Sequence, residues 1–283
     1  MDMAKILVVG GAGGVGSALV DMLVERGDDV EVTVLNSSEA AQVSARHGEK
    51  VGIHAVDLGD ADAALAALKS AIGGMDRLDA VAVCAAMAPV GPIETTPLSV
   101  FRKTIEVNTI AHVAIFQAAL PALRNSKGRI VFISSMAGQT SMPFIGAYTA
   151  SKWGLEGVAD IMRQEVANQG VKITLIEPGG IKTPMVDNQL AQVKQVVETL
   201  DPDVDARYGH LYRGFLKAAG DSNASGASTP AQVAAVLIEA LDAAEPETRY
   251  IAGDDAKQLI GLSKQVSDRE MDGIFAGLFA GNA

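Results

Sequence analysis

The sequence is poor in cysteine and in positive charge. Its 283 residues include a single cysteine, Cys84, so the chain cannot form an internal disulfide. Lysine and arginine together number 23 against 34 aspartates and glutamates, which gives a net charge of −11 at pH 7. Because nucleic acids and anionic membranes attract basic proteins, we expect neither of them as a partner.

Membrane spans and metal-binding patterns are also missing. Glycine, aspartate or lysine interrupts every apolar run before it reaches the ~20 residues of a transmembrane helix. The amino terminus enters an apolar strand pattern directly, without the charged start and long apolar stretch of a signal peptide. No spacing of cysteine, histidine and carboxylate is typical of a zinc site, so we predict no metal. We expect a cytoplasmic protein.

The remaining composition is that of a folded protein, with 48% hydrophobic and 20% charged residues. Short apolar runs rich in β-branched residues alternate with longer amphipathic stretches. This alternation predicts a Rossmann-type α/β fold, a doubly wound parallel sheet with helices on both faces, in one domain over residues 1–283. We expect strands at 5–9, 30–35, 51–56, 78–85, 129–134, 171–177 and 249–253. We expect helices at 17–26, 38–47, 61–72, around 98–117 with a second one onward to 123, at 148–168 and at 230–244.

Residues 185–229 break this alternation. The segment is polar, rich in glutamine, aspartate and glycine, and has scattered aromatic residues at Tyr208, Tyr212 and Phe215. Long irregular insertions in compact domains often close over a substrate, so we expect a substrate lid here. The alternative is a surface excursion with two short helices.

A glycine-rich turn follows the first predicted strand. Gly10, Gly14 and Gly16 form the pattern GxxxGxG immediately before an amphipathic helix. Glycine lets the backbone turn sharply and approach a ligand, and the free N–H groups at a helix start attract phosphate. The turn therefore predicts binding of a dinucleotide pyrophosphate. A triphosphate-binding P-loop is excluded, because no Lys-Ser or Lys-Thr pair follows the glycines.

The end of the second strand bears on the choice of cofactor. In this fold an acidic residue there hydrogen-bonds the ribose of NAD, whereas a basic residue accommodates the extra phosphate of NADP. Asn36 and Ser37 stand at this place and are neither acidic nor basic, and the glycine turn carries no Lys or Arg. We expect NAD or NADP, and the missing positive charge favours NAD.

Tyr148 and Lys152 form the pattern YxxxK at the start of a predicted helix. Residues four apart lie one helical turn from each other, and a cation favours the phenolate form of a nearby tyrosine. We therefore predict that Lys152 lowers the pKa of Tyr148, which could then exchange a proton with an alcohol or carbonyl oxygen. The alternative for so short a pattern is a partly buried tyrosine beside a surface lysine.

Further polar residues follow predicted strands, at the edge where open α/β sheets bind ligands. Ser135 follows the strand at 129–134, and the Pro178-Gly179 turn follows the strand at 171–177. The order and spacing of the motifs resemble the short-chain dehydrogenase/reductase family over nearly the whole chain. The motifs that carry this resemblance are the glycine turn, Asp57-Leu58, Asn108, Ser135, the YxxxK pattern, and Pro178-Gly179 with Thr183.

The resemblance implies a role for each of these residues. Tyr148 would be the general acid/base, and Ser135 would hold the substrate oxygen. Lys152 would bind the nicotinamide ribose, and Asn108 would anchor a water that links Lys152 to a proton relay. The residues expected to contact the cofactor are Gly10, Gly14, Val15, Gly16, Asn36, Ser37, Asp57, Leu58, Ala85, Tyr148, Lys152, Pro178, Gly179, Ile181 and Thr183.

Two positions depart from the family pattern. Val9 stands before the first glycine, where the family usually has threonine, and Cys84 replaces an asparagine that normally braces the sheet and the cofactor loop. We expect the hydrogen bonding of this loop to differ. No base accompanies Cys84 in the sequence, so a small packing residue is expected rather than a nucleophile.

The expected substrate is a small apolar molecule. Residues 245–257 resemble the branch of the family with retinol and hydroxysteroid dehydrogenases, which act on bulky apolar alcohols and carbonyls. The alternative is that the apolar residues near the expected mouth only pack the lid. These residues are Met142, Pro143, Phe144, Met185 and Leu190.

A homodimer or homotetramer is also implied by the resemblance. Ala111, Ala114 and Ala118 would allow helices to approach closely in such an interface. A run of apolar residues at helical spacing near the carboxyl end is expected to pack against the body or a second subunit. The run consists of Met271, Ile274, Phe275, Leu278 and Phe279.

The sequence thus predicts an alcohol dehydrogenase or ketone reductase that uses NAD(P) on a steroid-, retinoid- or aryl-like substrate. One alternative is a 3-ketoacyl thioester reductase, against which the net acidity and the missing basic cofactor residue count. Another is a non-catalytic, dinucleotide-sensing binding protein. The complete set of Asn108, Ser135, Tyr148 and Lys152 counts against it.

Overall fold

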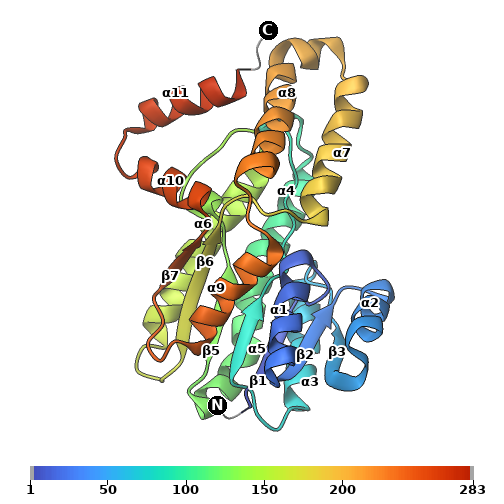
Figure 1. The fold of residues 1–283 in the computed structure, drawn as a ribbon, viewed down its shortest axis with the longest axis vertical. Helices are drawn as coiled ribbons and strands as arrows, with labels where there is room; N and C mark the ends of the chain where they lie inside the picture. Colours follow the sequence, from blue (N-terminus) through green and yellow to red (C-terminus); the bar gives the residue numbers. More distant parts are fainter. Residues whose placement is uncertain (1–2, 281–283) are drawn as a thin grey trace.

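Seven strands form one sheet in the computed structural model, which describes residues 3–280 but not the side chains of residues 222–225. The strand order is β3-β2-β1-β4-β5-β6-β7, and every neighbouring pair is parallel (Figure 1). The chain winds outward from β1 in both directions, which confirms the predicted doubly wound Rossmann-type sheet. The strands are β1 (Lys5–Val9), β2 (Asp29–Val34), β3 (Val51–Ala55), β4 (Ala80–Val83), β5 (Arg129–Ile133), β6 (Lys172–Pro178) and β7 (Arg249–Ala252).

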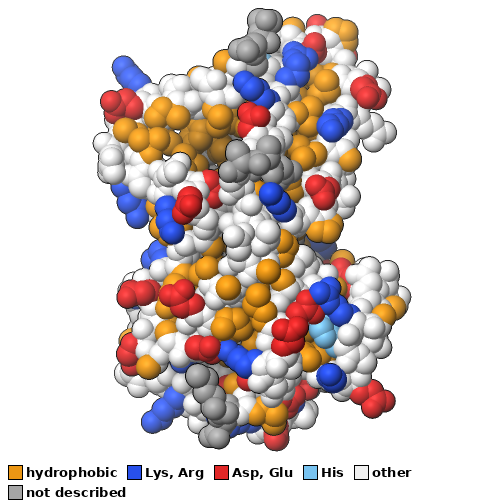
Figure 2. Space-filling view, viewed as in Figure 1, with side chains coloured by type: hydrophobic (Ala, Val, Ile, Leu, Met, Phe, Trp, Pro, Cys, Tyr) orange, Lys and Arg blue, Asp and Glu red, His pale blue; other side chains and the backbone are white. Residues whose placement is uncertain are grey.

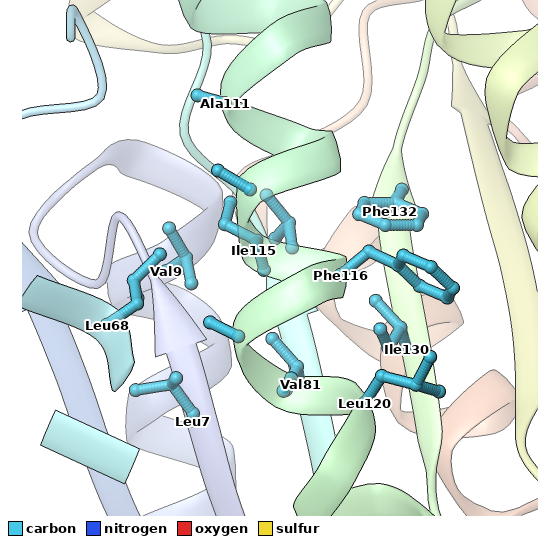
Figure 3. Packing of buried hydrophobic residues seen from close by; sticks show 14 of the residues in the cluster. Leu7, Val9, Leu68, Val81, Ala111, Ile115, Phe116, Leu120, Ile130 and Phe132 are labelled. Carbon is cyan, nitrogen blue, oxygen red and sulfur yellow. The ribbon is translucent and has the colours of Figure 1, made fainter. Parts of the chain in front are cut away.

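Each face of the sheet has its own hydrophobic core, because successive strand residues point to opposite faces. Leu7 and Val9 pack on one face with α3, α5 and α6, and Figure 3 shows Ile115 of α5 among these strand side chains. Ile6 and Val8 pack on the other face with α1, α2 and α9. These helices are α1 (Gly14–Arg26), α2 (Ser37–His47), α3 (Ala61–Gly73), α5 (Ala111–Ser126), α6 (Gly146–Glu165) and α9 (Pro230–Asp242).

The helical stretch between β4 and β5 is not continuous. Where two helices were predicted, one around 98–117 and another onward to 123, the structure has α4 (Leu98–Ile105), a π-helical turn (Glu106–Ile110) and then α5. Asn108 lies inside the π-helical turn. Such turns are rare and frequently mark functional sites, so this interruption belongs with the site described below.

The prediction of an irregular segment at 185–229 is wrong in its secondary structure. Two long helices occupy it, α7 (Pro184–Glu198) and α8 (Pro202–Ser225). The Thr183 side chain caps α7, and proline occupies its first position, where the missing N–H costs nothing. The helices rise from the carboxyl edge of the sheet and form the upper part of the molecule in Figure 1.

The spacing of the aromatic residues in this segment indicates a helix, although the prediction describes them as scattered. Tyr208, Tyr212 and Phe215 stand at positions i, i+4 and i+7, which is the spacing of one helical face. In the structure they pack together on the inner side of α8. The Asp201 carboxylate accepts a hydrogen bond of 2.9 Å from the N–H of Asp203 and so caps the start of α8.

Two further helices, α10 (Asp254–Ser263) and α11 (Asp268–Phe279), follow β7. Met271, Phe275 and Phe279 of α11 are buried, as their helical spacing predicted, and α11 packs against α8, whereas Ile274 and Leu278 are exposed. Figure 2 shows hydrophobic side chains gathered along α11 and between it and α8. Among the described residues, no helix combines the length and apolar character that a membrane span requires.

The alanines of α5 do not lie on an open face. Ala111, Ala114 and Ala118 are buried within the core of this chain, so the expectation that they serve an interface between subunits is wrong. Small side chains do allow close approach here, but the helix that approaches α5 is α3 of the same chain.

Two leucines in helices test how strongly the fold depends on this core. Leu68 of α3 is fully buried, whereas Leu98 of α4 is 67% exposed. We expect Leu68→Ala to lower the free energy of unfolding by roughly 2–5 kcal/mol, because it removes buried methyl groups and leaves a cavity. Leu98→Ala should change it by less than about 0.5 kcal/mol. Urea denaturation measures both, and equal losses would contradict the assignment of the core.

Candidate active site

A cavity of about 780 Å³ lies at the carboxyl edge of the sheet, between the ends of the strands and the first turns of α7. Six of the seven described strands end beside it, which is where a doubly wound sheet binds its ligand. Of the residues predicted to contact a cofactor or substrate, those that line it are Gly10, Gly14, Val15, Asp57, Leu58, Ala85, Ser135, Tyr148, Lys152, Pro178, Gly179, Ile181 and Thr183.

The glycine turn forms one wall of the cavity with its backbone. Gly10 has a φ of +83°, a left-handed conformation that favours glycine, and its N–H donates to both oxygen atoms of Thr33. A Cβ on Gly10 would lie 2.8 Å from Ala85, and one on Gly14 would lie 2.9 Å from Thr183. The turn therefore fits a dinucleotide pyrophosphate, which needs this close approach of the backbone and the helix start that follows.

Gly16 lies one turn further along α1 and does not line the cavity. A Cβ at Gly16 would overlap the carbonyl oxygen of Gly10, so this glycine allows α1 to pack on the turn. Thr33 supplies the hydroxyl that braces Gly10, although valine stands at the position before the first glycine. The hydroxyl that accepts a hydrogen bond from Gly10 therefore comes from the neighbouring strand β2, whereas the family usually has a threonine at position 9.

The end of β2 contributes residues that the sequence reasoning missed. Asn36 and Ser37 lie outside the lining, and the Asn36 side chain caps α2 by accepting a hydrogen bond from Glu39 N–H. Glu39 and Gln42 line the cavity instead. The Glu39 Oε2 atom accepts a 2.8 Å hydrogen bond from the backbone N–H of Leu35, which holds the carboxylate at the strand end. Glu39 and Gln42 stand three residues apart in α2 and so share one face of that helix, which is the signal that could have found them.

Ser135, Tyr148 and Lys152 meet on the wall of the cavity near β5. Ser135 is the second residue after that strand, and Tyr148 is the third residue of α6. The Lys152 Nζ atom lies 5.7 Å from the centre of the Tyr148 ring and donates a 2.7 Å hydrogen bond to the carbonyl oxygen of Ile133. Lys152 is 1% exposed, so the alternative of a surface lysine does not hold.

The prediction that Lys152 lowers the pKa of Tyr148 is wrong for this arrangement. Burial raises the pKa of Tyr148 above its usual value, and a hydrogen bond with the Ser135 hydroxyl opposes this only in part. Burial also lowers the pKa of Lys152 to about 8, against the attraction of the Glu156 carboxylate one turn along α6. The Lys152 ammonium hydrogen-bonds the main chain of β5 and stands beside the phenol ring rather than at its oxygen.

Asn108 lies behind this wall and does not line the cavity. Its side chain is fully buried and donates to the carbonyl oxygen of Met87 and to the Ser151 hydroxyl, at 2.7 and 2.9 Å. Its Oδ1 atom accepts from the N–H of Met87 at 2.9 Å. The amide thus ties the segment after β4 to α6, next to Lys152.

The turn after β6 is braced by a residue from the far end of the chain. The Asp255 carboxylate accepts hydrogen bonds from the N–H of Gly180 at 2.7 Å and of Ala256 at 2.9 Å. A Cβ on Gly179 would overlap this carboxylate, so a larger residue there would displace the Asp255 side chain. In the sequence, the feature that could have indicated this bracing role is an aspartate at the start of the helix that follows the last strand.

A buried group of charged and polar side chains lies beside α6, and we refer to Gln139, Glu156, Glu177 and Arg249 as the charge cluster. Arg249 approaches Glu156 at 2.9 Å and Glu177 at 3.2 Å, and Gln139 donates to both carboxylates. Both carboxylates are at least 95% buried. The cluster joins the turn after Ser135, helix α6, the end of β6 and the strand β7.

The part of the cavity that is lined by α7 and by the segment after β4 is apolar. Met142 and Met185 line it as predicted, whereas Pro143, Phe144 and Leu190 do not. Gln189 is the polar exception among the described lining residues here, and its side-chain amide donates to the carbonyl oxygen of Ala88. The remaining lining residues at this end are Met87, Ala88, Val90, Met136, Ile145, Val186 and Phe215.

Cys84 lies at the end of β4, on the cavity wall. Burial raises the pKa of its thiol to about 12, so it is neutral and unreactive at physiological pH. Its N–H and that of Ala85 both donate to the carbonyl oxygen of Val9. Backbone hydrogen bonds therefore connect β4 to β1 here, and the thiol acts as a packing group.

Comparison with known proteins agrees with this geometry. The sequence model of the family described as short chain dehydrogenase matches residues 4–194. Oxidoreductase BOA17 of Botryotinia fuckeliana is 31% identical over 93% of this chain and 94% of its own. Retinol dehydrogenase 7 of Rattus norvegicus is 28% identical over 89% of this chain and 81% of its own.

Solved structures share the fold. A short-chain dehydrogenase from Streptomyces avermitilis superposes with a TM-score of 0.75 at 24% identity, covering 98% of this chain and 95% of its own. A short chain dehydrogenase from Burkholderia cenocepacia, in complex with NADP, gives 0.74 at 18% identity, covering 96% and 97%. The likeness extends over the whole chain, α7 to α11 included.

The charge cluster predicts a pH dependence of stability. Burial and the neighbouring Glu156 raise the pKa of Glu177 from 4.5 to about 7. The folded protein therefore binds more protons than the unfolded chain between these values, so the free energy of unfolding should fall as pH rises from 5 to 8. We expect Glu177→Gln to remove roughly 1–3 kcal/mol of this fall, measured by urea denaturation across that range.

The matched control is Asp160→Asn. Asp160 faces the same guanidinium of Arg249, but its pKa is lowered, so it is charged in both states from pH 5 to 8. That variant should keep the pH slope of the wild type. A Glu177→Gln slope equal to the wild-type slope would show that Glu177 does not titrate as described.

Proposed function

The chain belongs to the short-chain dehydrogenase family and is an NAD(P)-dependent oxidoreductase, and we propose that it interconverts an apolar alcohol and its carbonyl with Tyr148 as the proton-transferring residue. The observation that carries the proposal is the meeting of Ser135, Tyr148 and Lys152 in the cavity that the glycine turn also lines. A redox reaction of an alcohol needs a hydride carrier and a proton carrier side by side, and this cavity has a place for both.

The proton path follows from the positions of the hydroxyls. In reduction, the Tyr148 hydroxyl donates its proton to the substrate oxygen, and the Ser135 hydroxyl donates a hydrogen bond that stabilises the developing charge. A bound nicotinamide supplies the hydride to the carbonyl carbon, or accepts it from the alcohol in the reverse reaction. Because burial keeps Tyr148 protonated at neutral pH, its side chain is ready to act as the acid.

Lys152 and Asn108 complete the proposed catalytic set. Lys152 would hold the nicotinamide ribose, since its ammonium is fixed by Ile133 on the same cavity wall. Asn108 would act by holding the segment after β4 against α6, because its side-chain amide is hydrogen-bonded to Met87 and Ser151. The glycine turn, Asp57, Leu58, Ala85, and the turn from Pro178 to Thr183 would hold the rest of the dinucleotide.

We propose NAD as the preferred cofactor, now on the basis of Glu39. Its carboxylate lines the cavity at the end of β2, where a ribose-binding acidic residue stands in this fold. A phosphate on that ribose would meet this negative charge. The cations among the described lining residues are Lys103 and Lys152. Neither would neutralise a phosphate at the end of β2, because Lys103 lies beside Asp57 and Lys152 is bonded to Ile133 of β5.

The apolar end of the cavity supports a lipophilic substrate. No charged side chain lines that end among the described residues, which disfavours a ligand with a charged carrier. The relatives named retinol dehydrogenase and 17-beta-hydroxysteroid dehydrogenase suggest which alcohols to test first. An absorbance screen at the reduced-nicotinamide band, across retinoids, steroids, aryl alcohols and ketoacyl thioesters with both cofactors, tests this proposal and the thioester alternative together.

Helices α7 and α8 are the proposed substrate lid. Met185, Val186 and Gln189 of α7 and Phe215 of α8 line the apolar end of the cavity. The proposed homo-oligomer would use the outer side of α6, where Trp153 and Ile161 are about half exposed, at 50% and 52%. Exposed large apolar groups on one helix are typical of association surfaces.

The role of Tyr148 is tested by Tyr148→Phe. Removing the hydroxyl takes away the proton donor, so turnover of the best compound from the screen should fall by at least about 1,000-fold. Calorimetric titration should show NAD binding within a few-fold of the wild type, because the ring remains. Turnover near the wild-type rate would refute the proposed role, and complete inactivity of the wild type across the screen would favour the dinucleotide-sensing alternative.

Glu39→Gln tests the cofactor preference. The wild type should bind NAD more tightly than NADP, and the variant should lose about 10-fold of that ratio because it lacks the negative charge. Glu25→Gln, on an exposed position of α1 away from the cavity, should leave the ratio unchanged. Tighter binding of NADP by the wild type would end the proposal of NAD.

A further inference from the structure

We propose that Phe144 is a positioning residue that makes the placement of Tyr148 depend on the docking of α8. The inference rests on the proposed function, because it assumes that Tyr148 transfers the proton. It concerns a residue that does not line the cavity, and so it cannot act by touching a ligand there.

The backbone of Phe144 has a conformation that its side chain disfavours. Its φ is +76°, and the other non-glycine residue with a positive φ among those described is Lys127. A left-handed conformation brings the Cβ of an ordinary residue too close to its own backbone, and phenylalanine has no short polar group to offset this. Such a residue keeps its conformation only where its surroundings hold it.

The side chain of Phe144 is held by the proposed lid. Its ring is 4% exposed and lies edge-on to Tyr212, with 4.8 Å between ring centres, and 5.1 Å from the ring of Phe215. Phe279 of α11 is buried in the same group, which we call the aromatic cluster. Residues of α8 and α11 therefore supply the contacts that stabilise the left-handed backbone at position 144.

The main chain of Phe144 leads directly to the catalytic helix. Ile145 is the residue before α6, its carbonyl oxygen accepts a 2.8 Å hydrogen bond from Thr149 N–H, and Tyr148 lies between them. The carbonyl oxygen of Phe144 accepts a 2.7 Å hydrogen bond from the N–H of Gly91. The position of the first turn of α6 therefore depends on the backbone at Phe144, which the aromatic cluster holds in place.

The consequence is a coupling between lid and catalyst. If α8 moves away, the ring of Phe144 loses its contacts, and the backbone relaxes toward an ordinary conformation. That change shifts Ile145 and the first turn of α6, and with them the Tyr148 hydroxyl. Of the residues proposed to hold the dinucleotide, Tyr148 and Lys152 lie on α6 and the others lie on other elements, so cofactor affinity should change much less than kcat.

Two substitutions remove the ring contact from either side. Phe144→Asn removes the ring, and because asparagine can adopt both left-handed and ordinary conformations, no contact with the lid then fixes the backbone at position 144. Tyr212→Leu removes the partner ring from α8, at a residue that does not line the cavity. We expect each to lower kcat for the best compound of the screen on the order of 100-fold, with the affinity for NAD within threefold of the wild type. The double variant should be no worse than the single variants, because both break one contact.

Matched controls separate this effect from general loosening of the fold. Tyr212→Phe keeps the ring and should retain wild-type kcat. Lys127→Gly relieves the other left-handed residue, at the end of α5 and outside the cavity lining, and should also leave kcat unchanged. Amide hydrogen exchange at Thr149, measured without any ligand, should be faster in Phe144→Asn and Tyr212→Leu and unchanged in both controls.

Wild-type kcat in Phe144→Asn and Tyr212→Leu would overturn the inference, as would losses that multiply in the double variant. A loss of NAD affinity equal to the loss of kcat would also overturn it. If Phe144→Asn does not fold, Tyr212→Leu carries the same test from the lid side. Full activity of Tyr148→Phe would mean that the proposed function fails, whereas an inactive Tyr148→Phe with an active Phe144→Asn would refute the coupling alone.

Discussion

A parallel sheet leaves the last residues of all its strands at one edge, and each following turn begins there. In this protein that constraint gathers Gly10, Glu39, Cys84, Ser135 and the Pro178 turn around one cavity, although they are far apart in the sequence. The helices then add what strands cannot supply. Helix α6 begins at the same edge, so its first turns present Tyr148 and Lys152 to residues from β5.

Much of the fold could be predicted from the sequence, because it depends on local periodicity. In β1, Leu7 and Val9 are buried on one face of the sheet and Ile6 and Val8 on the other, so the strand appears in the sequence as a continuous apolar run. Helices α7 and α8 could not be predicted from apolar runs, since polar residues separate their apolar residues into short runs and the apolar face is narrow. Only the spacing of Tyr208, Tyr212 and Phe215 indicates that face, and it becomes informative once a helix is considered.

The candidate site was predictable where a motif has a fixed spacing, as for the glycine turn and for Tyr148 with Lys152. It was not predictable where a side chain arrives from elsewhere. Glu39 lines the cavity from α2, and Asp255 braces the turn after β6 from more than 70 residues away. The pKa values also depended on the three-dimensional structure, because burial raises the pKa of Tyr148 although the sequence places a lysine one turn from it.

The two separate cores restrict which changes of chain length the protein can accept. In β5, Ile130 and Phe132 face one core and Val131 faces the other. Inserting or deleting one residue within this strand would exchange the two sets of side chains and also displace Ser135 from the sheet edge. Length variation among related sequences should therefore concentrate at the opposite edge, in connections such as residues 244–247, which belong to neither core and do not line the cavity.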